Sequence, residues 1–257
     1  MANAVRAWLD DRIRLRAMLD FLAHKRVPDQ RHSVWYYLGG VTLFLYGIQV
    51  ATGVLLLLYY RPAPESAFES VRFIVTKVPF GWLVRSLHAW AANLMVAAAF
   101  AHFFSVFFLK AYRAPREPTW MTGCVLLALT MAFGFSGYLL PWNTLAFFAT
   151  KVGTDIVGAI PGVGHAIRVV ARGGEEVSGA TLTRFFGVHV ALLPLATTLL
   201  LLAHLALIQI HGMSEPPEQA GREPSHLPFY PDFMLREAFI WLLVLAVLVG
   251  LATFLPW

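Results

Sequence analysis

Long apolar blocks separated by short polar segments dominate the chain. Five continuous apolar runs each reach about 20 residues, the length that a helix needs to cross a bilayer. They occupy residues 34–60, 82–110, 120–140, 185–210 and 236–256. Because a helix satisfies its own backbone hydrogen bonds in lipid, the pattern predicts an all-α integral membrane protein with five spans.

The connections between these blocks are polar and rich in proline. "RPAPESAFES" and "YRAPREPTW" are predicted as turns outside the hydrocarbon. Residues 141–184 are too long for a turn, and "TLAFFATKVGTDIVGAI" within them is typical of short interfacial helices. Residues 4–22 mix apolar positions at helical spacing with Arg and Asp, which indicates a helix on the membrane surface or one packed on a partner.

This pattern divides the chain into three parts. Residues 1–33 form an N-terminal amphipathic segment, and residues 34–210 form a four-helix core that includes the 141–184 loop. Residues 211–257 form a linker and a fifth transmembrane helix. No short apolar segment with a cleavage site precedes the first span, so we expect no signal peptide and an insertion signal in the first span itself.

The basic residues predict an orientation. Seven Lys or Arg residues precede the first span and three follow the second, whereas residues 141–184 contain four. The positive-inside rule therefore predicts a cytoplasmic N-terminus in a bacterial-type plasma membrane. The net charge of +5 is spread along span ends, which argues against nucleic-acid binding. The single cysteine, Cys124, excludes an internal disulfide and a cysteine-held metal cluster within this chain.

Four histidines lie inside predicted spans: His88 and His102 in the second, His189 and His204 in the fourth. Ionisable side chains at membrane depth cost several kcal/mol unless they are paired or coordinated. The spacings of 14 and 15 residues are close to four helical turns, so each pair shares a face and spans about 21–22 Å. His88 then faces His189 near the outer side, and His102 faces His204 near the inner side. Each facing pair could supply both axial ligands of a haem iron.

Glycines in the other two spans repeat this spacing. Gly39 and Gly53 in the first span, and Gly123 and Gly137 in the third, are again 14 residues apart. Since these helices run the opposite way, Gly39 and Gly123 match the inner level. Missing side chains let a flat macrocycle approach the backbone, although small residues also serve ordinary helix packing in membranes. Together the two registers predict two haems and electron transfer across the membrane.

Several segments of residues 30–212 carry a family resemblance: "LGGVTLFLYGIQVATG", "FGWLVRSLHAW", "PREPTW", "GYLLPWN" and "TLTRFFGVHV". They resemble the cytochrome b family of quinol-oxidising bc-type complexes, most closely the short cytochrome b6 form. The resemblance implies a dihaem subunit of a quinol:cytochrome c oxidoreductase that is inactive alone. It would carry electrons from an outer quinol-oxidation site to an inner quinone-reduction site, with proton translocation.

The resemblance also implies roles for individual residues. His88 and His189 would ligate the outer haem iron, and His102 and His204 the inner one. Arginines near haem propionates would be Arg85 and Arg184 at the outer haem and Arg116 at the inner one, although all three also suit ordinary interfacial positions. The outer quinol pocket would include Tyr138, Phe148, Ala149 and Val152. His211 would lie at the inner quinone site.

Two departures from the family pattern shape the expected cofactors and partners. Tyr37 stands where the plastid-type family has a cysteine that holds an additional haem, so no covalent haem is expected. The sequence has no Pro-Glu-Trp-Tyr segment, which borders the quinol pocket in the family. A second cytochrome b subunit is therefore expected to supply it, beside a Rieske iron-sulfur protein and a c-type cytochrome in a dimeric membrane complex.

Two alternatives remain open at this stage. The chain could be a dihaem cytochrome b subunit of a membrane dehydrogenase or hydrogenase, which exchanges electrons with quinone without bifurcation. The glycine register and "GYLLPW" argue against this alternative. It could also be a haem-free scaffold or transporter subunit whose histidines pair with polar groups.

Overall fold

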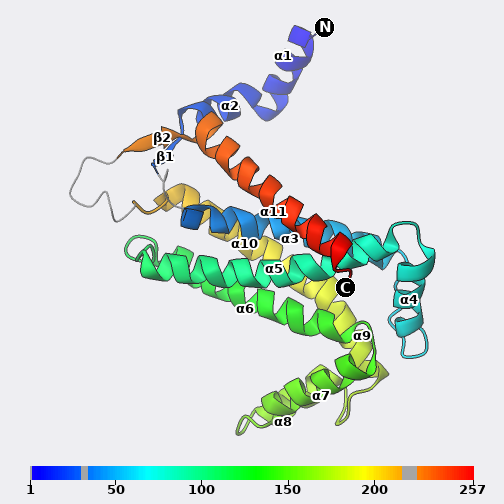
Figure 1. Ribbon diagram of the computed structural model, residues 1–257. Helices are drawn as coiled ribbons and strands as arrows, with labels where there is room; N and C mark the ends of the chain where they lie inside the picture. Colours follow the sequence, from blue (N-terminus) through cyan, green and yellow to red (C-terminus); the bar gives the residue numbers. More distant parts are fainter. Residues whose placement is uncertain (1, 30–33, 216–224) are drawn as a thin grey trace.

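The computed structural model describes residues 2–29, 34–215 and 225–257, and long helices dominate it (Figure 1). Within these residues, five helical segments are long and apolar enough to cross a membrane, which confirms the predicted all-α membrane fold. Their main helices are α3 (Leu38–Leu57), α5 (Gly81–Phe108), α6 (Glu117–Leu139), α10 (Leu193–His211) and α11 (Met234–Phe254).

Four of these helices form a bundle, and the fifth crosses its outside. α3 packs along α5, α6 packs along α10, and α11 lies obliquely across α5 and α3 (Figure 1). The α3–α5–α11 seam buries Val41, Leu45, Ala91, Met95 and Leu248. Small residues such as Ala91 let helices approach closely in a membrane, where packing replaces the hydrophobic effect as the driving force.

The fourth span begins earlier than the hydropathy pattern predicts. It runs without a break from Gly179 to His211, through α9 (Gly179–Gly187), the π-helical turn η2 (Val188–Leu192) and α10. Pro194 has no backbone N–H and cannot donate to the carbonyl four residues earlier, so it favours a local change of helical pitch. A π turn accommodates one residue more than an α turn.

We call the two ends of the bundle outer and inner, following the orientation predicted from the charges. At the outer end lie α4 (Ala67–Lys77), α7 (Thr144–Gly158) and α8 (Gly164–Arg172) (Figure 1). The helix α4 was not predicted, because prolines dominate the start of that connection. α7 and α8 occupy the loop in which short interfacial helices were expected.

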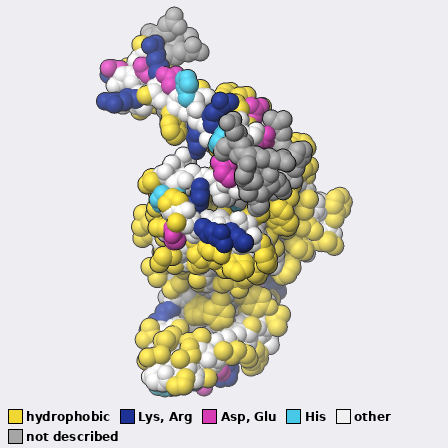
Figure 2. Space-filling model, turned by 90° about the vertical axis from the view of Figure 1, so that its left-hand side faces the viewer, with side chains coloured by type: hydrophobic (Ala, Val, Ile, Leu, Met, Phe, Trp, Pro, Cys, Tyr) yellow, Lys and Arg dark blue, Asp and Glu magenta, His cyan; other side chains and the backbone are white. Residues whose placement is uncertain are grey.

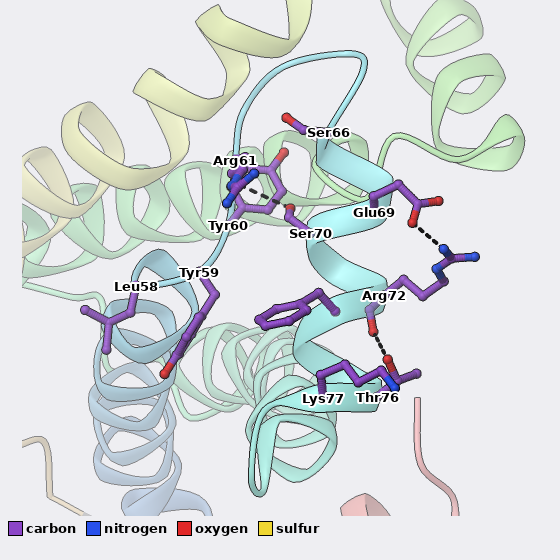
Figure 3. Close-up of a pocket in the computed structure, with 11 residues that line it drawn as sticks. Leu58, Tyr59, Tyr60, Arg61, Ser66, Glu69, Ser70, Arg72, Thr76 and Lys77 are labelled. Atoms are coloured by element: carbon purple, nitrogen blue, oxygen red, sulfur yellow. Dashed lines mark hydrogen bonds and ion pairs between the residues drawn. The ribbon is translucent and has the colours of Figure 1, made fainter.

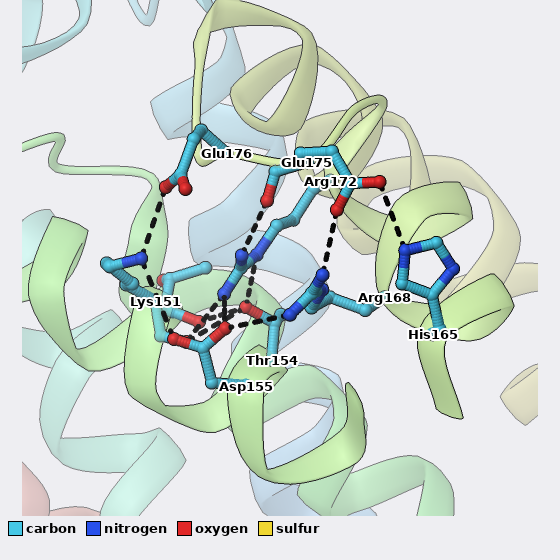
Figure 4. Close-up of polar contacts among 9 residues, drawn as sticks. Lys151, Thr154, Asp155, His165, Arg168, Arg172, Glu175 and Glu176 are labelled. Atoms are coloured by element: carbon cyan, nitrogen blue, oxygen red, sulfur yellow. Dashed lines mark hydrogen bonds and ion pairs between the residues drawn. The ribbon is translucent and has the colours of Figure 1, made fainter. Parts of the chain in front are cut away.

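A buried arginine holds the outer helices together (Figure 4). Arg172 is 1% exposed and donates to Thr154 Oγ1 and Asp155 Oδ1 at 2.7 Å, and to the carbonyls of Lys151 and Glu175 at 2.8 Å. The Arg172 guanidinium also lowers the pKa of the Asp155 carboxyl. These bonds join α7 and α8 to the segment that leads into the fourth span, so the loop is a folded unit.

The inner end is built from short elements. α1 (Ala2–Ile13) and α2 (Leu15–His24) project from the bundle, and β1 (Arg26–Pro28) pairs antiparallel with β2 (His226–Pro228). The short helices η1 (Val34–Tyr37) and η4 (Phe229–Phe233) lead into α3 and α11. Figure 2 shows basic side chains gathered on this end, with hydrophobic side chains around them. The predicted boundary at residue 33 lies outside the described residues.

Candidate cofactor site

Two histidines face each other in the outer half of the bundle. The rings of His88 on α5 and His189 in η2 have centroids 6.5 Å apart and are inclined by 72°. An iron bound to one nitrogen of each ring at about 2 Å would place the centroids roughly 6 Å apart. Within the described residues, no group of three or more His, Cys, Asp or Glu side chains could hold a metal ion. The pair therefore fits an iron whose remaining ligands come from a macrocycle.

The π turn explains the unequal spacing of the histidines. His88 and His102 are 14 residues apart on the α-helix α5, whereas His189 and His204 are 15 apart. His189 lies inside η2, where the extra residue is absorbed. Both pairs therefore cover about the same rise of 21 Å, and both keep their members on one face.

The outer glycines leave room for the imidazole rings. A Cβ at Gly53 would lie 3.4 Å from His88 Cε1, and one at Gly137 would lie 2.7 Å from His189 Cε1. By contrast, a Cβ at Gly134 on the same helix would meet nothing within 4 Å. The nearest protein atoms to both glycines are therefore those of the histidine rings.

The inner level repeats the arrangement. A Cβ at Gly39 would lie 3.2 Å from His102 Cε1, and one at Gly123 would lie 3.4 Å from His204 Cε1. Each of the four histidines is therefore paired with one glycine of a neighbouring helix. The levels match those expected from the antiparallel spans.

Three hydroxyls that the sequence analysis missed hold imidazole nitrogens. Nδ1 lies 2.8 Å from Thr52 Oγ1 in His88, 3.0 Å from Ser136 Oγ in His189, and 2.9 Å from Thr122 Oγ1 in His204. Their positions in the sequence could have identified them, because each hydroxyl residue directly precedes one of the four glycines.

These contacts determine which ring nitrogen carries the proton. A hydroxyl has one hydrogen, and Thr52 Oγ1 uses it toward the carbonyl of Ile48 at 2.7 Å. Ser136 Oγ lies at the same distance from the carbonyl of Ala132. Each hydroxyl oxygen therefore accepts a hydrogen from Nδ1, which leaves the Nε2 lone pair free for a metal.

The three predicted propionate arginines lie in different surroundings. Arg85 is half-buried one turn before His88, and among the described residues its guanidinium has no hydrogen-bond or ion-pair partner. Arg184 is exposed on α9 and packs against Gly173. Arg116 donates to two carbonyls after the end of α10, at 3.1 Å each. Of the three arginines, Arg85 is thus the one best placed to pair with a carboxylate of a bound ligand. Arg116 instead joins α6 to the residues that follow α10.

The predicted outer-pocket residues come from two adjoining helices. Tyr138 lies in the last turn of α6, and α7 carries Phe148, Ala149 and Val152. The two helices meet where Gly153 packs against the ring of Phe135. Phe148 and Val152 lie four residues apart on one face and are 55% and 58% exposed, so this apolar surface lacks a second wall within the described residues.

The inner end contains one predicted and one unpredicted group. His211 ends α10, and its Nδ1 is buried without a hydrogen-bond partner among the described residues. Glu237, in the first turn of α11, packs its carboxylate directly on Gly40, next to the glycine that contacts His102. Because Glu237 is the second residue of the predicted span 236–256, its place in the sequence is that of an ordinary interfacial carboxylate. Tyr37 is buried and stacks on Phe233, with centroids 5.2 Å apart.

A separate pocket of about 500 Å³ lies at the outer end, between the end of α3 and α4 (Figure 3). Its wall includes Tyr59, Arg61 and Lys77, and its Arg72 pairs with Glu69 at 2.6 Å. It contains none of the histidines and none of the residues predicted for the quinol pocket.

Comparisons with known proteins agree with this arrangement. The family model described as "Cytochrome b/b6/petB" matches residues 23–212. A protein of Chlorobaculum thiosulfatiphilum described as "Cytochrome bc complex cytochrome b subunit" is 49% identical over 99% of this chain and 60% of its own length. "Cytochrome b6" of Oltmannsiellopsis viridis is 43% identical over 83% of this chain and 99% of its own length.

A solved structure shares the fold. A chain of "Hyperthermophilic respiratory Complex III" superposes with a TM-score of 0.88 and 31% identity, over 97% of this chain and 68% of that chain. This chain thus spans about two thirds or less of the longer relatives, but nearly the whole length of the cytochrome b6 protein. The predicted family resemblance is confirmed, and the chain belongs to the cytochrome b/b6 family.

Proposed function

We propose that this chain is the dihaem cytochrome b subunit of a quinol:cytochrome c oxidoreductase of the bc or b6f type. The observation that carries the proposal is the pair of histidine levels, each with two imidazoles and two matching glycines. Membership of the family implies haem b as the cofactor. Haem b supplies a one-electron carrier, and two of them about 21 Å apart would connect the two membrane surfaces.

Each part of the chain has a role in this proposal. His88 and His189 would bind the outer iron, and His102 and His204 the inner one. Arg85 would neutralise a propionate of the outer haem, since its guanidinium is half-buried and unpaired among the described residues. The glycines keep the ligand rings close to the neighbouring helices, so the rings are held in place before the cofactor binds.

Quinol oxidation would take place at the outer end, against the exposed apolar face of α7. Phe148 and Val152 on α7 offer exposed apolar side chains for a quinone ring, and Tyr138 at the end of the adjoining α6 is proposed to complete this wall. The other wall would come from a Pro-Glu-Trp-Tyr segment outside residues 1–257, and the electron acceptor would be a Rieske protein followed by a c-type cytochrome. A dimeric complex would hold these partners in a bacterial plasma membrane with the N-terminus of this chain in the cytoplasm.

Quinone reduction would take place at the inner end. His211 and Glu237 are the titratable side chains that we propose for proton delivery there. The Nδ1 of His211 has no partner among the described residues, and the Glu237 carboxylate lies beside the helix that contacts the inner ligand His102. Protons taken up inside and released outside would build a membrane potential.

The test is purification of the chain with its associated proteins from native membranes. We expect a Rieske protein, a Pro-Glu-Trp-Tyr sequence and, with the inner quinone site blocked by an inhibitor, haem b reduction by quinol that stops when the Rieske cluster is removed. Haem reduction that is independent of the Rieske protein would favour the non-bifurcating dehydrogenase type. Absence of haem would contradict the proposal as a whole.

A further inference from the structure

The four histidines differ in how their second ring nitrogen is bound. His88 and His189, both at the outer level, have a hydroxyl at Nδ1, and so does His204 at the inner level. His102 is the exception, because its Nδ1 is buried and has no hydrogen-bond partner among the described residues.

The sequence supplies the reason for this exception. Thr52, Thr122 and Ser136 each directly precede the glycine that faces a histidine, so a common helical geometry brings their oxygens to Nδ1. Leu38 holds the equivalent position before Gly39, and it has no polar atom in its side chain. The outer level therefore has two hydroxyl-bound imidazoles and the inner level has one.

We propose that Thr52, Ser136 and Thr122 are positioning residues that tune the two haems unequally. The inference rests on the proposed binding of haem by the four histidines. A hydrogen bond from Nδ1–H to an oxygen raises the basicity of the imidazole. A more basic ligand stabilises ferric iron over ferrous iron, so it lowers the reduction potential. With two such ligands at the outer level and one at the inner level, these hydroxyls lower the potential of the outer haem more than that of the inner one.

The hydroxyls also fix ring orientation. Each is anchored to a carbonyl of its own helix, at 2.7 Å for Thr52 and Ser136 and at 2.9 Å for Thr122. The imidazole plane cannot rotate without breaking the bond at Nδ1. His102 lacks this restraint at Nδ1 among the described residues, and its ring packs against Gly39.

The chain offers matched variants for a potentiometric titration of the haem absorption bands, which needs no quinol turnover. Thr52→Val keeps the shape of the side chain and removes the acceptor of His88. Thr130→Val is the control, because Thr130 Oγ1 donates to the carbonyl of Leu126 and has no histidine contact. Leu38→Ser adds a hydroxyl toward His102, and Leu38→Ala controls for the lost volume.

Thr52→Val is expected to raise the potential of the outer haem by about 59 mV, a tenfold change in a one-electron equilibrium, and to leave the inner potential unchanged. Leu38→Ser is expected to lower the inner potential relative to Leu38→Ala. Selective loss of the outer haem in Thr52→Val would also support the positioning role. If wild-type protein binds two haems and all four variants keep its potentials, the inference is wrong. If wild-type protein binds no haem, the proposed function itself fails.

Discussion

The outer and inner ends of the bundle use the same histidine–glycine register but surround it differently. At the outer end, a hydroxyl binds each imidazole and Arg172 ties α7 and α8 into one folded unit. At the inner end, short strands and turns replace this unit, and two imidazole nitrogens, in His102 and His211, are buried without partners among the described residues. Buried polar atoms without partners are rare in folded proteins, so these two nitrogens distinguish the inner end from the outer one.

One histidine–glycine register thus occurs in two different surroundings. The outer level is held rigidly by groups of this chain, which suits a carrier placed next to a reaction that must be tightly controlled. At the inner end, Nδ1 of His211 has no partner among the described residues, as the proposed quinone-reduction site would require.

Replacing one ligand histidine tests whether the two levels are independent. His102→Ala is expected to remove the inner haem and to leave the absorption of the outer haem, because His88 and His189 lie about four helical turns away. The measurement is the haem-to-chain ratio together with the reduced-minus-oxidised spectrum. Retention of both haems would refute the ligand assignment.

A single methyl group at the outer level tests the role of the glycines. Gly137→Ala places a Cβ 2.7 Å from His189 Cε1, closer than such atoms approach, so the ring must move. Outer-haem occupancy is expected to fall severalfold while the inner haem remains. Gly134→Ala on the same helix adds the same methyl group in open space and is expected to have no effect. Equal occupancy in the two variants would show that the glycine register is ordinary packing.

Replacing the buried Arg172 tests whether α7 and α8 are a folded unit. Arg172→Leu deletes a buried guanidinium with four acceptors, and destabilisation of this region is expected on the order of 3 kcal/mol. Hydrogen exchange is expected to accelerate in α7 and α8 and to remain unchanged in α3 and α5. Arg168→Leu is the comparison, because Arg168 is less buried and its loss is expected to cost less. Uniform acceleration across the bundle would contradict a local unit.

Acid is expected to weaken the same unit slightly. The pKa of Asp155 is lowered by Arg172, and the pKa of Glu175 is lowered by its hydrogen bond to Arg168. A depressed folded-state pKa contributes stability that is present above about pH 4 and is lost as the pH falls below it. Protection factors in α7 and α8, which correct exchange rates for the intrinsic pH dependence of amide exchange, should therefore be lower at about pH 3 than at about pH 5. Asp155→Asn should reduce this difference. An unchanged difference would show that Asp155 does not contribute to the pH dependence.

The sequence predicted the elements whose signals are periodic. Spans, histidine levels and glycine levels all follow helical spacing, so they could be predicted from the sequence alone. The π turn was not, because a single extra residue in a helix leaves no periodic trace and becomes visible only as the odd spacing of His189 and His204. α4 was missed because its amphipathic stretch follows a proline-rich turn.

The missed site residues share a physical reason. Serine and threonine in membrane helices usually bond to their own backbone, so Thr52 and Ser136 carry no visible sign of a second partner. Glu237 lies near the start of its span, where a carboxylate is commonly interfacial, and only the packing against Gly40 places it at the inner level. Such contacts depend on how helices are rotated against each other, which the pattern of one helix does not contain.

The most direct test of the central claim is the haem content of the purified wild-type chain. Two haem b groups per chain, with two separate one-electron reduction waves, are predicted by the two facing histidine levels. A single haem would contradict the assignment of a haem to each histidine level. No haem would contradict the redox function altogether.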